Sequence, residues 1–273
     1  MSEFPHEAFL RHIAACNNAV LPGRRVRVIL GGRPVGFALP EHAPTAPLPD
    51  AVAFDAHLAG LARVGAFRPR HELFDVRDEA TGHALAAIDR GAIPLLGTLA
   101  DGVHMNGLVR RPDGIHLWVA RRAPNKKLDP GKLDHIVAGG VPRGLGPRET
   151  LVKEAWEEAS LTPDLVAKAK PETVLAYALD RAEGLRRDRI HVYDLWLPEG
   201  VTPRPNDDEV AGFDLWPISA VLESVARTED FKFNVNLVLI DLFLRLGVID
   251  PAGATGRRAA MALQPLRGRH GSA

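Results

Sequence analysis

The sequence predicts an α/β fold, in which a mixed β-sheet lies between layers of helices, preceded by a small α+β domain. Strand-like and helix-like apolar patterns alternate from about residue 97 to residue 250. A glycine loop leads directly into an amphipathic helix near residue 150. The composition is that of a globular protein, because 46% of the 273 residues are hydrophobic and 25% are charged. This length allows two modest domains, each large enough to bury a core.

The first 96 residues predict the α+β domain, whose role is unknown. Apolar residues at helical spacing around Phe9 predict a helix that ends before Pro22, and Gly31-Gly32-Arg33-Pro34 predicts the turn of a hairpin. Four prolines then break the chain between residues 40 and 49. The remaining predicted elements are a helix from Val52 to Val64 and a strand followed by a helix within Leu73 to Ile88.

Residues 97–250 predict the second domain, whose element spacing suits a three-layer α/β/α sandwich. Its predicted elements are strands at Val103–Val109, Ile115–Arg121, Thr173–Leu179, Ile190–Leu197 and Gly212–Leu215, and closing helices at Ile218–Ala226 and Val235–Gly247. The first two strands are joined by a turn at Arg111-Pro112-Asp113-Gly114. The tail, residues 251–273, carries arginines, no acid and many small residues, so we predict that it is disordered.

The charge balance argues against nucleic acid as a partner, because 34 basic and 34 acidic side chains leave no basic surplus. A small molecule is the more natural partner. Cys16 is the single cysteine and is expected to be a buried structural thiol. The longest apolar run, Leu237 to Ile249, contains Asp241 and Arg245 and cannot span a bilayer. Without a secretory signal pattern, we expect a soluble cytoplasmic protein, and the sequence does not indicate its oligomeric state.

The predicted helix that follows Gly139-Gly140 has one acidic face. Glu154 and Glu158 stack one turn apart, with Glu157 about 60° to one side. Three carboxylates on a narrow strip repel one another, and hard oxygen ligands suit Mg²⁺ or Mn²⁺ rather than zinc. The strip is therefore a candidate metal site. The alternative is the solvated face of an amphipathic helix.

The same stretch resembles the signature box of the Nudix hydrolases, and this resemblance implies the α/β/α sandwich. Residues Lys153 to Leu161, with the sequence KEAWEEASL, stand where that family has Arg-Glu, an apolar residue, any residue, Glu-Glu, any residue, Gly and an apolar residue. Lys153 replaces the family's Arg, Ser160 replaces its Gly, and Leu145 stands where the first Glu of the box is expected. Glu149 is interpreted mainly as an i,i+4 partner of Lys153.

With these departures the sequence resembles one branch of the family, whose members hydrolyse oxidised or antagonist forms of thiamine diphosphate. The resemblance extends from about Gly97 to Ile249, and the first ninety or so residues resemble the N-terminal domain of unknown function attached to that branch. The matching pieces are His104 to Gly107, Leu117 to Arg122, Lys126-Lys127, Pro130 to Asp134, Ala138-Gly139-Gly140, Gly144-Leu145, Glu149 to Glu154, Glu157 to Ser160, Asp208-Glu209-Val210 and Phe231 to Asn234.

The resemblance implies a role for each of four carboxylates. Glu154, Glu157 and Glu158 are the expected ligands of Mg²⁺ or Mn²⁺. The expected catalytic carboxylates are Glu157, Glu158 and Glu209, where Glu209 lies far from the helix in sequence and is a further ligand or base. For Glu209, an acidic surface turn is an equal alternative.

The remaining candidate residues are expected to bind the substrate. They are Gly139 and Gly140, which let a phosphate approach closely, Lys126 and Lys127, which could hold the terminal phosphate, and Asn106 and Trp118, on strands expected to face the cleft. A solvated basic loop is the alternative for the lysines, and a core position is the alternative for the tryptophan. Four histidines show no ligand spacing and are interpreted as structural or surface residues: His104, His116, His135 and His191.

Three functions agree with this pattern. The leading hypothesis is a Mg²⁺-dependent hydrolase that converts thiamine diphosphate derivatives, such as oxo- or oxythiamine diphosphate, to the monophosphate and phosphate. A second is a hydrolase of ADP-ribose or a dinucleotide, because fold and box do not fix the substrate. A third is a non-catalytic module that binds diphosphates, in which the missing glutamate of the box marks lost catalysis.

Overall fold

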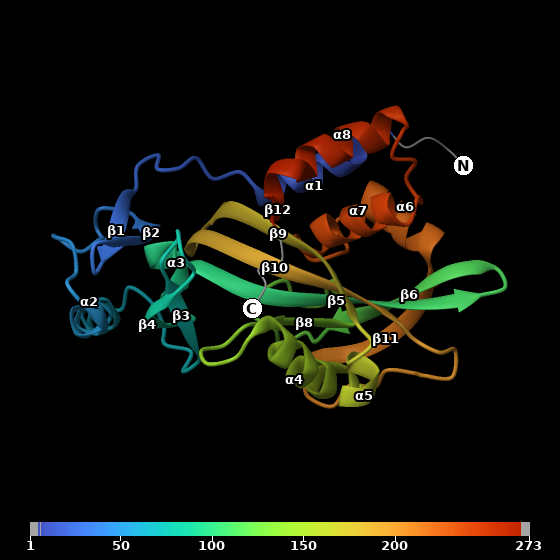
Figure 1. The fold of residues 1–273 in the computed structure, drawn as a ribbon, viewed down its shortest axis with the longest axis horizontal. Coiled ribbons are helices and arrows are strands. Elements are labelled where there is room, and N and C mark those ends of the chain that lie inside the picture. Colours follow the sequence, from blue (N-terminus) through green and yellow to red (C-terminus); the bar gives the residue numbers. More distant parts are fainter. Residues whose placement is uncertain (1–4, 6, 269–273) are drawn as a thin grey trace.

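The computed structural model describes residue 5 and residues 7–268 of the chain. Two lobes are visible in Figure 1. Residues 26–96 form the small lobe at one end of the molecule, and the larger lobe surrounds a long β-sheet. Within the described residues, no helix combines the length and the apolar character that crossing a membrane requires.

The sheet of the larger lobe is mixed, as predicted. Within the described residues it has eight strands: β5 (Leu99–Arg111), β6 (Gly114–Arg122), β7 (Leu133–Asp134), β8 (Val137–Gly140), β9 (Lys170–Arg181), β10 (Gly184–Trp196), β11 (Val210–Pro217) and β12 (Arg267–Gly268). The main order is β11-β6-β5-β10-β9-β12, while β7 pairs with β6 and β8 pairs with β5. The pair β5–β10 is parallel and the other pairs are antiparallel.

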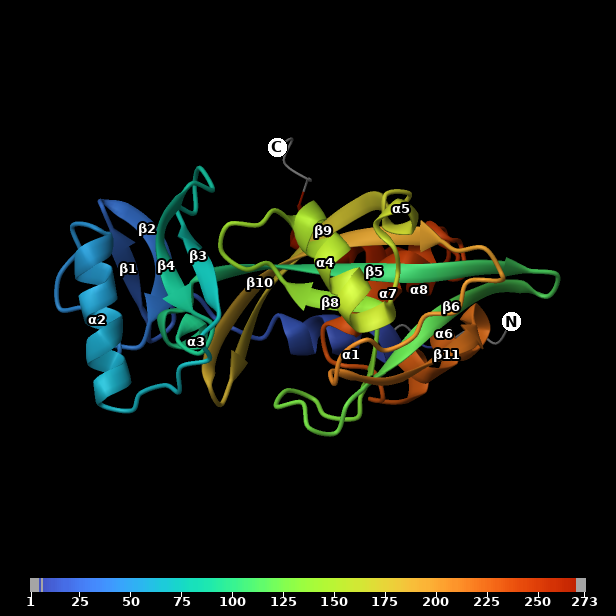
Figure 2. The same ribbon diagram turned by 90° about the horizontal axis from the view of Figure 1, so that it is seen from below.

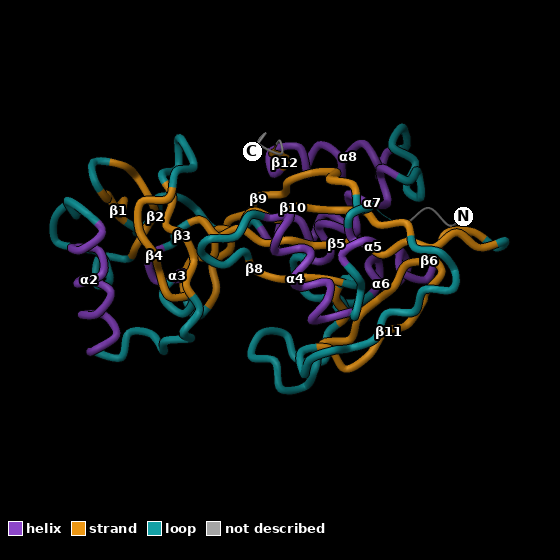
Figure 3. The backbone as a smooth tube through the Cα atoms, turned by 60° about the horizontal axis from the view of Figure 1, so that its bottom comes forward, coloured by secondary structure: helices purple, strands orange, loops and turns teal. Residues whose placement is uncertain are grey.

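Helices cover both faces of this sheet, which confirms the predicted α/β/α layers (Figures 1 and 3). One face carries α1 (Glu7–Cys16), α6 (Ile218–Arg227), α7 (Val235–Arg245) and α8 (Ala254–Leu263), and the other carries α4 (Pro147–Ala159) and α5 (Pro163–Val166). Helix α7 is buried along almost its whole length because it lies among α1, α6 and α8. A helix that is apolar on every side requires such surroundings.

The small lobe has a hydrophobic core of its own, which includes Phe54, Phe74 and Ile88. Its elements are β1 (Val26–Leu30), β2 (Arg33–Ala38), α2 (Ala51–Arg63), β3 (Leu73–Arg77), β4 (Ala84–Asp89) and α3 (Ile93–Leu96). The helix predicted within Leu73 to Ile88 is wrong, because β3 and β4 pair as an antiparallel hairpin. Gly82 supplies a left-handed residue, with φ of 75°, in the connecting turn.

Two terminal segments differ from prediction because both pack on the larger lobe. Helix α1 was expected in the N-terminal domain, but its buried Phe9 and Cys16 belong to the core formed with α7 and β9. The tail was expected to be disordered, but α8 buries Ala259 and Leu263 in the same core, and β12 pairs with β9. Small residues in α8 allow close packing, and the burial of apolar side chains offsets the conformational entropy that is lost when the chain becomes ordered. Residues 269–273 of that tail lie outside the described residues. A domain boundary near residue 97 stays a prediction.

Gly97 joins the two lobes under tight steric constraint. Its φ is 53°, and a Cβ atom there would lie 2.4 Å from the carbonyl oxygen of Phe37 and 2.7 Å from Cδ2 of Leu185. Nearby, the Arg187 guanidinium pairs with Glu79 of the small lobe. The lobes are therefore in direct contact where β5 begins.

We predict that Gly97→Ala destabilises the protein more than Gly82→Ala. Both positions have positive φ, which costs an alanine about 1–2 kcal/mol, but only Gly97 has backbone and side-chain atoms where the new methyl would lie. The expected losses in the free energy of unfolding are about 1–2 kcal/mol for Gly82→Ala and about 2–5 kcal/mol for Gly97→Ala. Urea denaturation measures both, and equal losses would contradict the steric account.

Candidate active site

Helix α4 holds the acidic strip beside strand β8 (Figure 2). Leu151 and Ala155, on the adjoining face of the helix, are buried in the core. Glu158 is only 7% exposed, and its Oε2 atom accepts a hydrogen bond of 2.8 Å from the backbone N–H of Ala138 in β8. Glu149 does not pair with Lys153 as expected. Its Oε2 atom instead accepts a 2.8 Å hydrogen bond from the Gly146 N–H at the start of the helix.

The two glycines of β8 provide space for side chains from elsewhere. A Cβ atom on Gly139 would lie 2.4 Å from Cδ of Glu154, and one on Gly140 would lie 2.7 Å from Cζ of Phe74 in the small lobe. Both glycines line the cavity described below. Their lack of a side chain lets Glu154 and Phe74 approach the strand.

The carboxylates of the strip differ in environment. Burial raises the pKa of Glu158 well above its usual range, and the charge of Glu154 adds to this effect. Burial also raises the pKa of Glu154, although the neighbouring Lys153 opposes the rise. Glu157 is half-exposed and accepts a 2.5 Å hydrogen bond from the Lys153 ammonium. A divalent cation would favour the ionised form of Glu154 and Glu158, and oxygen donors of this kind fit Mg²⁺ or Mn²⁺.

A cavity of about 820 Å³ lies between this strip and the small lobe. Glu154 and Glu157 line it on the α4 side, and Arg70 and Arg90 line it on the small-lobe side. Its sheet face includes Gly102, His104, Asp188 and Ile190, and two loops add Asn125 to Leu128 and Asp207 to Glu209. The cavity therefore requires both lobes.

Two predicted site residues, Lys126 and Glu209, lie on these loops and form an ion pair with each other. Burial alone would raise the pKa of Glu209, but the hydrogen bond and charge of Lys126 bring it below its usual value. The positive charge of Lys126 is therefore balanced by the Glu209 carboxylate. Lys127 is exposed and lines the cavity as well.

Asn106 and Trp118, which were expected to contact the substrate, do not line the cavity. The Asn106 amide is fully buried and donates a 2.8 Å hydrogen bond to Asp194, which also pairs with Arg245 of α7. Trp118 belongs to the core between the sheet and α4. Both residues are on the expected strands, but their positions along the strands place them under the covering helices.

A buried cluster that the sequence did not indicate adjoins the cavity through His104. His104 and His135 approach through their Nδ1 atoms at 2.8 Å. Among the described residues, His104, Asp134 and His135 are the one group of three whose possible ligand atoms lie within 4.8 Å of one another. The Asp134 Oδ2 atom, however, already receives the Arg122 guanidinium at 2.7 Å and lies 3.5 Å from the Lys232 ammonium. A cation there would compete with two fixed positive charges.

The other two histidines agree with a structural interpretation. His116 is buried and lies 3.6 Å from Asp113, and the Nε2 atom of His191 lies 2.9 Å from Asp101. The cluster of His104 and His135 left no local signal, because the two residues are 31 positions apart and meet only through the pairing of the strands.

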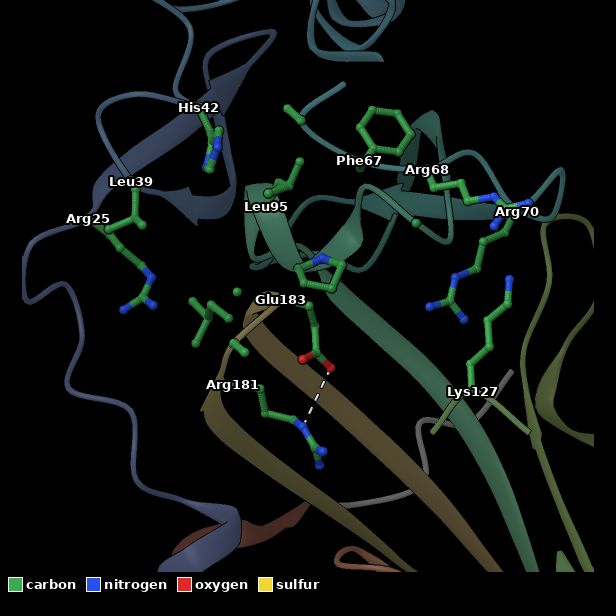
Figure 4. A pocket seen from close by; sticks show the side chains of 16 residues that line it. Arg25, Leu39, His42, Phe67, Arg68, Arg70, Leu95, Lys127, Arg181 and Glu183 are labelled. Carbon is green, nitrogen blue, oxygen red and sulfur yellow. Dashed lines mark ion pairs between the residues drawn. The ribbon is translucent and has the colours of Figure 1, made fainter. Parts of the chain in front are cut away.

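A second cavity, of about 540 Å³, adjoins the first (Figure 4). The two share six lining residues, which are Arg70, Gly91, Pro94, Lys127, Arg181 and Glu183. Figure 4 shows Arg70 and Lys127 extending into the same space from the two lobes, and Arg181 paired with Glu183 at 3.5 Å. The boundary between the cavities is therefore rich in basic groups.

We predict that the His135 ring makes stability depend on pH. Burial lowers its pKa to about 4, so between about pH 6.5 and pH 4 the unfolded chain takes up a proton that the folded chain does not. Stability therefore falls as the pH falls through this window. From pH 7 to pH 5 the loss from this group is about 2 kcal/mol, and His135→Gln should remove that share. Urea denaturation at both pH values measures it, and an identical pH dependence in the two proteins would contradict the account.

Comparison with known proteins places this site in a family. Residues 102–236, which run from β5 into α7 and contain β8 and α4, match the NUDIX domain. Nudix hydrolase 20, chloroplastic, of Arabidopsis thaliana is 37% identical over 182 residues, which is 67% of this chain and 49% of that protein. Nudix hydrolase 24, chloroplastic, of the same species is 38% identical over 182 residues, 67% of this chain and 50% of that protein.

A third relative comes from yeast. Uncharacterized protein YJR142W of Saccharomyces cerevisiae (strain ATCC 204508 / S288c) is 33% identical over 178 residues, 60% of this chain and 52% of that protein. The chain thus spans about half the length of the curated relatives it matches. The acidic helix, the glycine strand and the mixed sheet described above all lie in the matched segment, and residues 102–236 of this chain form a domain of the Nudix family.

Proposed function

We propose that the chain is a metal-dependent hydrolase of diphosphate-linked small molecules. The observation that carries this proposal is the position of Glu154 and Glu158. Glu154 lies on the wall of the 820 Å³ cavity, and Glu158 is buried one turn further along α4, with the pKa of both carboxyl groups raised by burial. Buried, clustered carboxylates are costly unless a cation binds them.

Glu154 and Glu158 would hold a Mg²⁺ or Mn²⁺ ion, which neutralises non-bridging phosphate oxygens and lowers the pKa of a water molecule. Glu157 can join them when its carboxylate leaves Lys153. Glu209 lies across the cavity, ionised beside Lys126, and accepts the proton of the attacking water. Lys127 and Arg70 line the same cavity and offer positive charge to the phosphates.

The substrate class we propose is thiamine diphosphate derivatives, hydrolysed to the monophosphate and phosphate. Its support is the resemblance in sequence, to which the Lys126-Lys127 and Asp208-Glu209-Val210 loops contribute. Both loops border the cavity. A volume of 820 Å³ also lies within the range of small-molecule sites.

We predict that Glu157→Gln and Glu158→Gln each lower kcat by about a hundredfold, as the loss of a metal ligand or a base commonly does. Phosphate release in the presence of Mg²⁺ measures the rate. Glu149→Gln is the matched control, because Glu149 lies on the same helix but outside the cavity, and glutamine can still accept the hydrogen bond from Gly146. Unchanged turnover in both site variants would rule out this strip.

We predict that kcat/KM is higher for oxo- and oxythiamine diphosphate than for thiamine diphosphate, and higher for each of these than for ADP-ribose. Oxidation removes a charge and deamination changes a hydrogen-bonding edge, and a site matched to the altered group rejects the intact cofactor because unpaired buried polar groups are costly. Parallel kinetics at saturating Mg²⁺ decide the order. If ADP-ribose is fastest, the nucleotide alternative replaces the thiamine assignment. Metal binding without any turnover would instead favour the binding module.

A further inference from the structure

The orientation of the Asn234 amide is set by its hydrogen bond to the Tyr177 hydroxyl. The Tyr177 hydroxyl donates its proton to Oδ2 of Asp188 at 2.5 Å, and the Arg186 guanidinium donates to the same oxygen. Because the Tyr177 proton is used in this way, the hydroxyl can only accept from Asn234, whose Nδ2 atom lies 3.3 Å away. The Oδ1 atom of Asn234 is therefore turned away from Tyr177.

This Oδ1 atom has no structural partner among the described residues. Asn234 immediately precedes α7, where an asparagine side chain commonly caps the first turn of a helix, but here it makes no capping hydrogen bond. The residue is 5% exposed and lines the 820 Å³ cavity. A buried acceptor without a partner is costly, and a ligand in the cavity would satisfy it.

Lys232 supplies the complementary donor from the same segment. It is 8% exposed, lines the same cavity and stands two residues from Asn234, so their Cα atoms are at most about 7 Å apart. Its ammonium lies 3.5 Å from Oδ2 of Asp134, an oxygen that already accepts from Arg122 at 2.7 Å. An ammonium has three N–H donors and no acceptor, so donors remain available for a ligand.

We propose that Lys232 and Asn234 recognise a lactam edge of the substrate, meaning a ring carbonyl beside a ring N–H. The carbonyl oxygen accepts from Lys232 and the ring N–H donates to Oδ1 of Asn234. This inference deepens the proposed function and rests on it for the diphosphate chemistry. It identifies the heterocyclic end of the substrate, which the carboxylates of α4 do not contact.

Hydrogen bonding to Lys232 and Asn234 distinguishes a lactam edge from an amidine edge. An amidine edge, in which an amino group stands beside a bare ring nitrogen, would place a donor against the Lys232 ammonium and an acceptor against the Asn234 oxygen. Both contacts would be lost, and the buried groups would stay unpaired. Deamination of an aminopyrimidine converts the amidine edge into the lactam edge, which makes the deaminated substrate the matched one. Ile190, buried on the sheet face of the same cavity, offers an apolar surface to the ring.

The test uses two pairs of diphosphates that differ in this edge. The first pair is oxythiamine diphosphate and thiamine diphosphate, and the second is uridine diphosphate and cytidine diphosphate. For the full-length chain with Mg²⁺, we expect kcat/KM to favour the lactam member, and Asn234→Ala to reduce that preference by about tenfold or more. Lys232→Met should reduce it in the same direction.

Asn236→Ala is the matched control. Asn236 is also a buried asparagine with an unpartnered side-chain atom among the described residues, but it lies within α7 and does not line the cavity. Its substitution should leave the ratio of the two members unchanged. Thermal melting of each variant separates lost recognition from lost folding, and the ratio within a pair is insensitive to the fraction of folded enzyme.

The possible outcomes distinguish the thiamine substrate class from the recognition of the lactam edge. If only the nucleotide pair is hydrolysed and its ratio responds to Asn234→Ala, the thiamine assignment fails and the edge recognition stands. If Asn234→Ala or Lys232→Met lowers kcat/KM equally for both members of each pair, these residues bind phosphate or stabilise the fold, and the inference is overturned. If the wild-type protein hydrolyses none of the four diphosphates, calorimetry of oxythiamine and thiamine binding tests the recognition of the lactam edge. Equal binding of the two, or no binding, overturns the inference.

Discussion

The close approach of helix α4 to strand β8 is the contact on which the active site depends. Glu154 lies where the side chain of residue 139 would be, so any residue larger than glycine would displace it. Glu158 is fixed on the next turn by the backbone N–H of Ala138. The strand thus positions one carboxylate by leaving space and the other by donating a hydrogen bond. Burial, which raises the pKa of both, is the physical reason that a divalent cation is the expected partner.

The small lobe completes this site. Phe74 packs over Gly140, one residue from the glycine that accommodates Glu154, and Arg70 and Arg90 line the opposite wall of the cavity. One cavity therefore has a carboxylate end on α4, a basic boundary made by both lobes, and an inner end of buried polar groups on the sheet and before α7. This division suits a substrate with a charged diphosphate and a polar ring, because each part meets a different environment.

Local patterns were sufficient to predict strands of the sheet, the acidic helix and its glycines, because alternation, turn residues and helical spacing are properties of short segments. Two predictions failed for different reasons. The β3–β4 hairpin was taken partly for a helix, because a short apolar run does not by itself distinguish a strand from a helix. Helix α8 was taken for part of a disordered tail, because α1 and α7, on which it packs, are remote in sequence. Trp118 was placed on the right strand but under α4 rather than at the cavity. The meeting of His104 with His135, and the unpartnered oxygen of Asn234, exist only in the folded chain.

The most direct test of the account is the location of a bound divalent cation. A crystal of the protein soaked in Mn²⁺ would reveal the ion by its anomalous scattering. The account predicts a peak between the carboxylates of Glu154 and Glu158, with Glu157 turned away from Lys153. A peak at His104, Asp134 and His135, or no peak near α4 at saturating Mn²⁺, would contradict it.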